Sequence, residues 1–245
     1  MIYDLRRLLA AMDTARAQRE FTPMADVIRA PHAGPRTVIW RFDVERALPH
    51  HVKLAEILSA RDMPCTLYFH TRRGCYAPAS LRAIQDLGHE VGIHHECLDR
   101  CAGDFEAARE LFLREVEMFH RDGLRLRTVC SHGEAGLRRE GYSTNWDLFE
   151  RYPNLLDEAG VQGEVYLWLR AQPPSLLYAS DTFSSYRRFW PTLDKAAKTD
   201  DPLMVLAHAH RWRNNPITTS LEVARDLRQR FSNKLLHSRR YDLAY

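Results

Sequence analysis

The sequence predicts a single α/β domain over residues 1–245, a distorted (β/α)7-type barrel with an added N-terminal helix. Short apolar runs alternate with segments of helical hydrophobic period between residues 37 and 206. Because strict alternation of strand and helix implies parallel strands joined by crossover helices, this pattern favours a parallel sheet. The chain has 245 residues, 45% of them hydrophobic, which suits one core of barrel size.

The N-terminal segment, residues 1–36, is expected to form a helical brace outside the barrel, which would occupy residues 37–235. A helix is expected from about Tyr3 to Ala17. It carries an apolar stripe at helical spacing: Leu5, Leu8, Leu9 and Met12. Two prolines and a glycine close to residue 34 then break the chain before the first strand.

Strands and helices alternate regularly through the first half of the barrel. Each expected strand is a short apolar run of the kind that is buried on both faces of a parallel sheet. The strands are expected at Thr37–Trp40, Cys65–Phe69, Val91–Ile93 and Leu126–Cys130. The helices are expected from Pro49, which suits a first helical turn, to Leu58, then at Pro78–Leu87 and at Phe105–Phe119.

The alternation is harder to follow beyond Gly133. Helical pieces are expected at Trp146–Tyr152 and Leu155–Ala159, strands at Leu176–Ala179 and Leu203–Leu206, and a last helix at Leu221–Phe231. The whole chain then offers about seven strand candidates. We therefore expect the second half of the barrel to be irregular.

Charge and hydropathy exclude several classes of protein. The formal net charge is only +3, and basic residues alternate with acidic ones, so a nucleic-acid partner is not indicated. No run approaches the roughly 20 apolar residues that span a bilayer, and residues 1–17 lack the apolar region of a signal peptide. An odd number of cysteines, five, favours reduced thiols. We expect a cytoplasmic protein, with no nucleic-acid or membrane partner, that acts on a small molecule or a saccharide.

Side chains that bind protons or metals gather at the ends of the apolar runs. In parallel α/β architectures, functional groups cluster at the carboxyl ends of the strands. Following the runs in order gives Asp43 and Glu45, His70, His94, His95 and Glu96, His132 and Glu134, Asp181, and finally His208 and His210. One such histidine is commonly structural, but the whole set indicates a metal-assisted hydrolase.

Several of these segments resemble polysaccharide deacetylases of carbohydrate esterase family four. They are Asp43-Val44-Glu45, Cys65-Thr66-Leu67-Tyr68-Phe69, Gly88-His89-Glu90-Val91-Gly92-Ile93-His94, Ser131-His132-Gly133 and Leu206-Ala207-His208. Their order and spacing match over roughly residues 37–212. The resemblance implies a barrel of the polysaccharide deacetylase kind and a divalent metal that serves to remove acetyl groups from N-acetylated sugars.

By position in these motifs, the resemblance implies roles for individual residues. Asp43 matches the aspartate that acts as general base, and His208 matches the late histidine that acts as general acid. His94 matches the first metal-binding histidine. Glu45 falls near the second, metal-binding aspartate, but one place late. The second metal-binding histidine of the family is replaced by Leu98.

The chain looks still closer to an uncharacterised branch of deacetylase-like proteins. That branch carries an Asp-Val-Asp motif, a His-x-Asp second motif, a serine and a histidine in the third motif, and a late histidine near tryptophan. The matching pairs here are Asp43/Glu45, His94/Glu96, Ser131/His132 and His208/Trp212. The metal triad of the family is therefore expected in a rebuilt form.

The spacing of the two carboxylates in the first motif suggests separate roles for them. One residue separates Asp43 from Glu45, so in an extended strand both side chains point to one face, where one can bind metal while the other takes a proton. We predict a metal triad of Glu45, His94 and His132. Imidazole and carboxylate ligands suit Zn²⁺, our first expectation, and also other first-row divalent ions.

Five further residues are predicted to bind the substrate: Arg41, Glu96, Asp181, His210 and Trp212. Arg41 would orient a carboxylate by bidentate pairing, and Trp212 would stack on a sugar ring. Asp181 would alternatively hold an imidazole in the required tautomer, or form a turn. Structural roles for the arginine and the aromatic residue stay open.

The expected function is removal of an acyl group, acetyl in the first instance, from an N-acylated sugar or a related small amide. The metal would activate water, Asp43 would accept its proton, and His208 would protonate the leaving nitrogen. Two alternatives stay open. One is a metal-independent amidohydrolase on the same fold, and the other is a catalytically inactive deacetylase-like binding protein.

Overall fold

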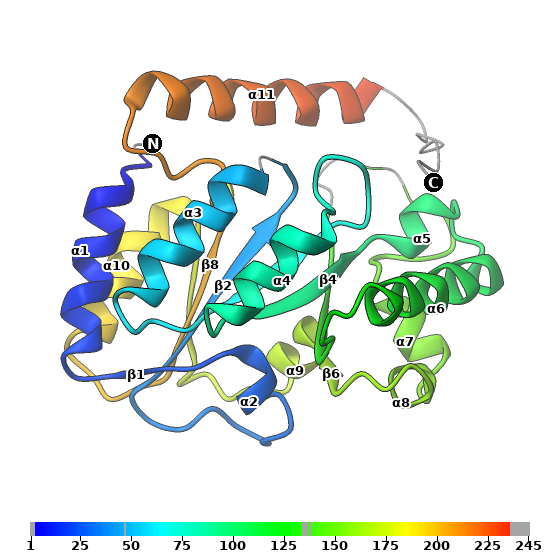
Figure 1. The fold of residues 1–245 in the computed structure, drawn as a ribbon, viewed down its shortest axis with the longest axis horizontal. Helices are drawn as coiled ribbons and strands as arrows, with labels where there is room; N and C mark the ends of the chain where they lie inside the picture. The colour runs from blue at the N-terminus through cyan, green and yellow to red at the C-terminus, as the bar shows by residue number, and fades with distance from the viewer. Residues whose placement is uncertain (1–2, 47, 134–136, 138, 236–245) are drawn as a thin grey trace.

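The structure is a computed structural model and describes residues 3–46, 48–133, 137 and 139–235 (Figure 1). Its strands are β1 (Glu20–Phe21), β2 (Thr37–Val44), β3 (Thr66–Phe69), β4 (Glu90–His95), β5 (Thr128–Ser131), β6 (Gly163–Glu164), β7 (Leu177–Ser180) and β8 (Leu203–Ala207). Its helices are α1 (Leu5–Arg16), α2 (Met24–Val27), α3 (Leu48–Ser59), α4 (Pro78–Asp86), α5 (Cys97–Arg100), α6 (Phe105–Arg121), α7 (Asp147–Arg151), α8 (Leu155–Glu158), α9 (Val165–Arg170), α10 (Tyr186–Ala196) and α11 (Pro216–Leu235).

All strands are parallel and lie in one sheet, in the order β6-β5-β4-β3-β2-β8-β7, with β1 paired to β2 off this path. Strands β2 to β6 follow one another in sequence, and β8 returns to pair with β2, which is the order of a barrel. Between β6 and β7 no ladder forms among the described residues, so the barrel is open there. The expected (β/α)7-type α/β fold with an added N-terminal helix is confirmed.

The first long strand extends further than its apolar run predicts. The expected strand ends at Trp40, but β2 continues to Val44, and Asp43 pairs in register with Tyr68 of β3. The polar residues in this extension, Arg41 and Asp43, are both buried and lie 3.4 Å apart, side chain to side chain. Because they neutralise each other, the strand can carry two charges into the core.

Side chains of the sheet alternate between two apolar clusters. Val38, Trp40 and Phe42 of β2 belong to the larger cluster, which also contains the apolar faces of α1, α3, α4 and α6. Ile39, between them, belongs to a smaller cluster with Tyr68 and Cys130. Neighbouring residues of a strand point to opposite faces, so this alternation defines which residues of β2 to β5 can meet on the second face.

The N-terminal segment contributes to the sheet as well as bracing it. Strand β1 pairs with β2, and the expected stripe of α1 is buried. The side chain of Asp4 caps α1 by accepting hydrogen bonds from the backbone N–H groups of Arg6 and Arg7. The hydroxyl of Tyr3 donates to the carbonyl of Asp181, which ties this segment to the end of β7.

The last helix, α11, starts at Pro216, five residues before the expected Leu221, and crosses the end of the sheet toward which β2 points (Figure 1). Its inward face is acidic, with Glu222 and Asp226 buried, whereas Ile217 and Phe231 are exposed. Ion pairs therefore attach α11 to the barrel. Among the described residues, no helix is both long and apolar enough to cross a membrane.

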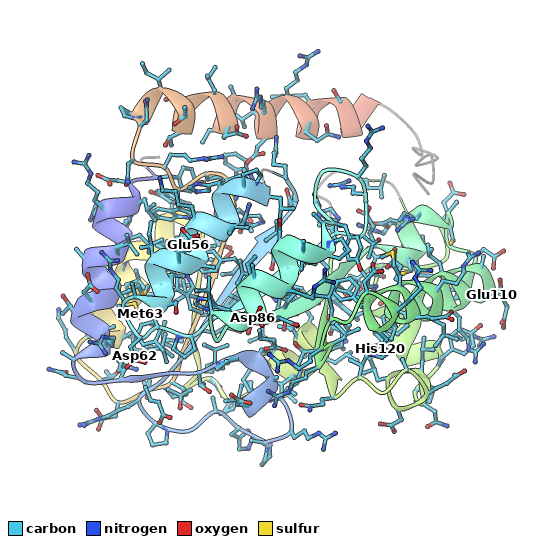
Figure 2. The ribbon with its side chains drawn as sticks, viewed as in Figure 1. Glu56, Asp62, Met63, Asp86, Glu110 and His120 are labelled. Carbon is cyan, nitrogen blue, oxygen red and sulfur yellow. The ribbon has the colours of Figure 1, made fainter. Side chains whose placement is uncertain are left out.

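Charged side chains elsewhere lie on the outside of the helical layer (Figure 2). Glu56, Asp86 and Glu110 are exposed on α3, α4 and α6, as is His120 on α6. Met63, also marked in Figure 2, is buried in the larger cluster. The ionisable side chains that are buried concentrate instead at the carboxyl ends of the strands.

Candidate metal centre

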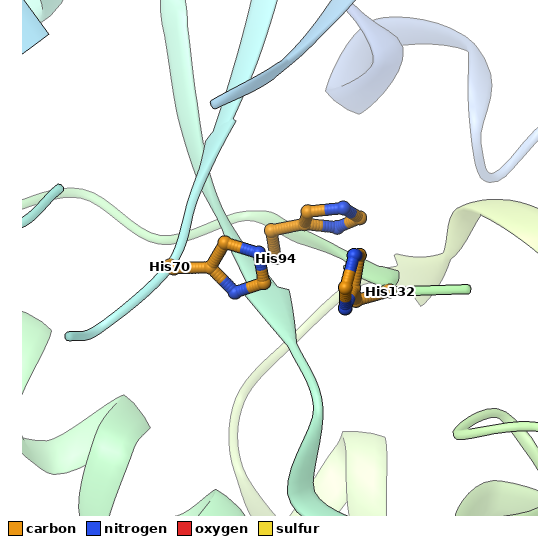
Figure 3. A group of neighbouring side chains, drawn as sticks. All are labelled: His70, His94 and His132. Carbon is orange, nitrogen blue, oxygen red and sulfur yellow. The ribbon is translucent and has the colours of Figure 1, made fainter. Parts of the chain in front are cut away.

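Three histidines from neighbouring strand ends gather at the carboxyl edge of the sheet (Figure 3). His70 follows β3, His94 lies in β4, and His132 follows β5. All three are buried or nearly so, each offers a ring nitrogen within 4.8 Å of the others, and their ring centroids are 4.7 to 5.0 Å apart. Three imidazoles at such spacing form a donor set that fits a divalent metal.

Each ring has its Nδ1 atom close to an oxygen atom of the protein. Nδ1 of His94 lies 3.0 Å from the carbonyl oxygen of Cys130. Oε2 of Glu96 lies 3.2 Å from Nδ1 of His132 and 3.7 Å from Nδ1 of His70. Among the described residues, Nε2 of His70, Nδ1 of His132 and Oε2 of Glu96 are buried without a hydrogen-bond partner. His94 is therefore held by a carbonyl on its other ring nitrogen, as is typical of metal-binding histidines, and Glu96 lies beside the other two rings.

Two carboxylates border the histidines. Oδ2 of Asp43 lies 3.6 Å from Nε2 of His94. Oε1 of Glu45 lies 3.6 Å from Nε2 of His132 and 3.5 Å from Nε2 of His208, and this side chain keeps 19% of its surface exposed. Of the predicted triad, the structure clusters His94 and His132, and His70, which follows directly after an expected strand, joins them among the described residues. Glu45 lies beside His132 and His208. Glu134 lies outside the described residues.

The family resemblance leads one to expect a second metal-binding histidine at residue 98. This position lies on the other side of β4. Leu98 is fully buried in the larger apolar cluster. His95, the last residue of β4, also faces away and packs against Phe112 and Phe149. His70 supplies an imidazole from the adjacent strand instead.

Burial and charge set the protonation of the three imidazoles. Burial lowers the pKa of His94 to about 4 and that of His70 well below its usual range, so both rings are neutral at pH 7 and able to bind a metal. Burial also opposes protonation of His132, but contacts with Glu45 and Glu96 outweigh it and raise its pKa to about 10. A divalent cation would replace the proton that these two carboxylates hold there.

Arg41 lies beside Asp43, the candidate general base, and is held by contacts with protein side chains. Its side chain is fully buried, with Nη2 3.4 Å from Oδ2 of Asp43 and 2.7 Å from the hydroxyl of Tyr166. Nη1 donates to the sulfur of Cys130 at 3.0 Å. Oδ1 of Asp43 accepts no hydrogen bond from the described residues. Arg41 thus pairs with Oδ2 of Asp43, and the other carboxylate oxygen stays buried without a partner among the described residues.

Replacing Arg41 by methionine should lower the free energy of unfolding by about 3 to 5 kcal/mol, because the charge of Asp43 would stay buried without a partner. Urea unfolding measures this change. The double variant Arg41→Met, Asp43→Asn should recover most of the loss, since neither charge remains. Arg36→Met is the matched control: its ion pair with Asp200 is 61% and 66% exposed, so the change in stability should be much smaller.

The candidate acid, His208, is held by Asp181. Nδ1 of His208 lies 2.6 Å from Oδ1 of Asp181, and Oδ2 of Asp181 accepts from the backbone N–H of His208 and from Nε1 of Trp212, both at 2.8 Å. Burial and the nearby Arg211 lower the pKa of His208, but Asp181 and Glu45 raise it more strongly, to about 9. His208 is thus a protonated imidazole at neutral pH, with Nε2 facing Glu45.

The residues predicted to bind the substrate are mostly buried in contacts with the protein. Trp212 and His210 have no exposed surface, and Nε2 of His210 lies 3.2 Å from Oδ2 of Asp226 on α11. Asp181 contacts His208, and Glu96 contacts His132. Arg41 contacts Asp43 in the same way, so these predicted substrate-binding residues lie behind the candidate site residues.

Comparisons with known proteins give a limited likeness. No family model matches the chain, and no curated protein matches it. Among solved structures, a mutant of a CE4 family pseudoenzyme with restored enzymatic activity superposes with a TM-score of 0.43 at 15% identity, covering 78% of this chain and 62% of that one. The wild-type CE4 family pseudoenzyme from Bacillus anthracis gives 0.43 and 15%, covering 78% and 60%.

A further similar structure is PdaA of Bacillus subtilis, a family 4 carbohydrate esterase, with a TM-score of 0.43 at 11% identity over 91% of this chain and 84% of that one. The chain spans about three fifths of the length of the pseudoenzyme structures. What this protein does is therefore argued from its own residues.

Proposed function

We propose that this protein is a metal-dependent amidohydrolase that removes an acetyl group from an N-acetylated sugar or a related small amide. The observation that carries the proposal is the set of three clustered imidazoles, His70, His94 and His132, which include buried ring nitrogens without a hydrogen-bond partner among the described residues, Nε2 of His70 and Nδ1 of His132. Three histidine ligands with open further positions are typical of catalytic Zn²⁺ sites. When bound, the metal would supply Lewis acidity toward a carbonyl oxygen and toward water.

The protein's own residues divide the proton transfers between them. Asp43, whose Oδ2 is paired with Arg41, would accept the proton of the attacking water through its unpartnered carboxylate oxygen. His208 would donate a proton from Nε2 to the leaving nitrogen, because Asp181 holds its Nδ1. Glu45 lies between His132 and His208, where it would contact the leaving group or serve as a further metal ligand.

The test combines metal analysis with hydrolysis. The purified protein should contain a divalent metal, and it should release acetate from some member of a panel of N-acetylated amino sugars and small acetamides. Chelation should abolish this activity, and added Zn²⁺ should restore it. Asp43→Asn should keep the metal and lower kcat by about 10² to 10⁴-fold. Glu110→Gln, on the outer surface of α6, is the control and should change nothing (Figure 2).

The outcomes separate the alternatives. Full activity after chelation would replace the proposal with a metal-independent amidohydrolase. Specific binding of an N-acetylated compound without any release of acetate would indicate a binding protein. Absence of bound metal together with an unchanged Asp43→Asn protein would overturn the proposal entirely.

A further inference from the structure

A buried asparagine lies behind the candidate metal centre. Asn145 precedes α7 and has no exposed surface. Its Nδ2 donates to the backbone carbonyl of His132 at 2.8 Å and to Oδ2 of Asp99 at 2.9 Å, and its Oδ1 accepts from the backbone N–H of Asp99 at 3.1 Å. Both amide hydrogens are used, and only this orientation of the amide matches donors with acceptors.

The partner of this asparagine is itself held firmly. Asp99 lies on α5 and is buried. Its carboxylate accepts from Nε and Nη2 of Arg139 at 2.7 and 2.8 Å and from the hydroxyl of Tyr142 at 2.8 Å. A bidentate guanidinium–carboxylate pair fixes direction as well as distance. Asn145 therefore contacts His132 from a rigid support.

His132 needs such support because it lies just beyond the end of its strand. The ladder between β4 and β5 ends at the pair His95 and Ser131. The backbone N–H of His132 still donates to the carbonyl of His95 at 2.8 Å, and its ring lies against Glu96. Its carbonyl has left the sheet, and the hydrogen bond from Asn145 takes the place of a strand partner.

We propose that Asn145, supported by Asp99, is a positioning residue that holds His132 in its metal-binding orientation. The consequence for metal affinity rests on the metal-dependent function proposed above. Without the amide donor, the peptide after His132 can rotate, and the ring moves with its backbone. Metal ligands must be held to within about 0.5 Å of their working position, so a small rotation suffices to weaken the site.

The experiment compares Asn145→Ala with wild type in two measurements. Crystal structures of the metal-free proteins give the position of the His132 ring, and titration with Co²⁺, followed by its visible absorption spectrum, gives metal affinity and ligand geometry. We expect a displaced ring, an altered Co²⁺ spectrum and a loss of affinity of about 10- to 100-fold, the usual effect of removing a group that orients a ligand. Asn145→Leu fills a similar volume and removes the same donor without adding a charge, so it carries the test if the alanine protein does not fold.

Asp147→Ala is the matched control. Asp147 shapes the same segment by accepting from the backbone N–H groups of Ser143 and Thr144, but it does not contact His132. An unmoved ring or an unchanged Co²⁺ affinity in Asn145→Ala would overturn the inference, as would equal effects of Asp147→Ala. If wild type binds no Co²⁺ while the ring still moves in Asn145→Ala, the positioning role holds and the metal-dependent function fails.

Discussion

Replacing His70 by alanine should lower the affinity for Zn²⁺ or Co²⁺ by more than about 100-fold, because loss of even an outer partner of a ligand costs about 10- to 100-fold. The reason is geometric. His70 contributes one of only three clustered imidazoles, and its Nε2 atom is buried with no other partner among the described residues. Activity at limiting metal should fall in proportion. Equilibrium titration of the metal-free protein measures the affinity.

Glu45→Gln is the comparison that gives this result its meaning. Glutamine keeps the shape of the side chain but binds metal poorly. If the three histidines are the ligands, Glu45→Gln should retain metal affinity within about tenfold and lose mainly kcat. The opposite outcome, normal metal binding in His70→Ala and loss of metal in Glu45→Gln, would establish the triad of Glu45, His94 and His132 that the motifs predict.

Replacing Asp181 by asparagine should move the alkaline limb of the pH profile to lower pH. In the native protein the pKa of His208 is about 9, so the acid stays protonated through neutral pH. Without Asp181, burial and the adjacent Arg211 would lower this pKa. Activity at pH 8 should fall by about 100-fold or more, since a general acid typically contributes 10² to 10⁴-fold. The profile of kcat/KM against pH measures the shift.

Two controls separate loss of the acid from loss of structure. Acetate esters of nitrophenols need no protonation of the leaving group, so Asp181→Asn should hydrolyse them almost normally.

The pH dependence of the free energy of unfolding should change as well. Because the pKa of His208 is raised in the folded protein, its contact with Asp181 stabilises fully below about pH 6.5, the usual histidine value, and this contribution is lost as pH rises through about 9. An unshifted profile, or equal losses on amides and nitrophenyl esters, would argue against His208 as the acid.

The first half of the fold could be predicted from the sequence because its strands are apolar and its helices are amphipathic. Strands β3, β4 and β5 lie within a few residues of their expected positions. Beyond Gly133 the same reasoning weakened, since β6 has only two residues and α10 contains Pro191. β6 exists by pairing with β5, and two residues leave no periodic pattern to detect. α10 packs on β7 and is amphipathic, with Phe189, Leu193 and Ala196 buried, but the proline inside it is typical of a helix break.

The candidate site, too, could be predicted from the sequence only in part. The sequence alone determined that acidic residues and histidines follow the strands, and parallel strands bring their carboxyl ends to one edge whatever the loops do. Only the tertiary structure decided how the groups are distributed. It turned His95 and Leu98 away, buried Arg41 against Asp43, and brought His70 beside His94. These choices depend on the register between neighbouring strands and on which face each residue occupies, and a one-residue shift in either would exchange the site with the core.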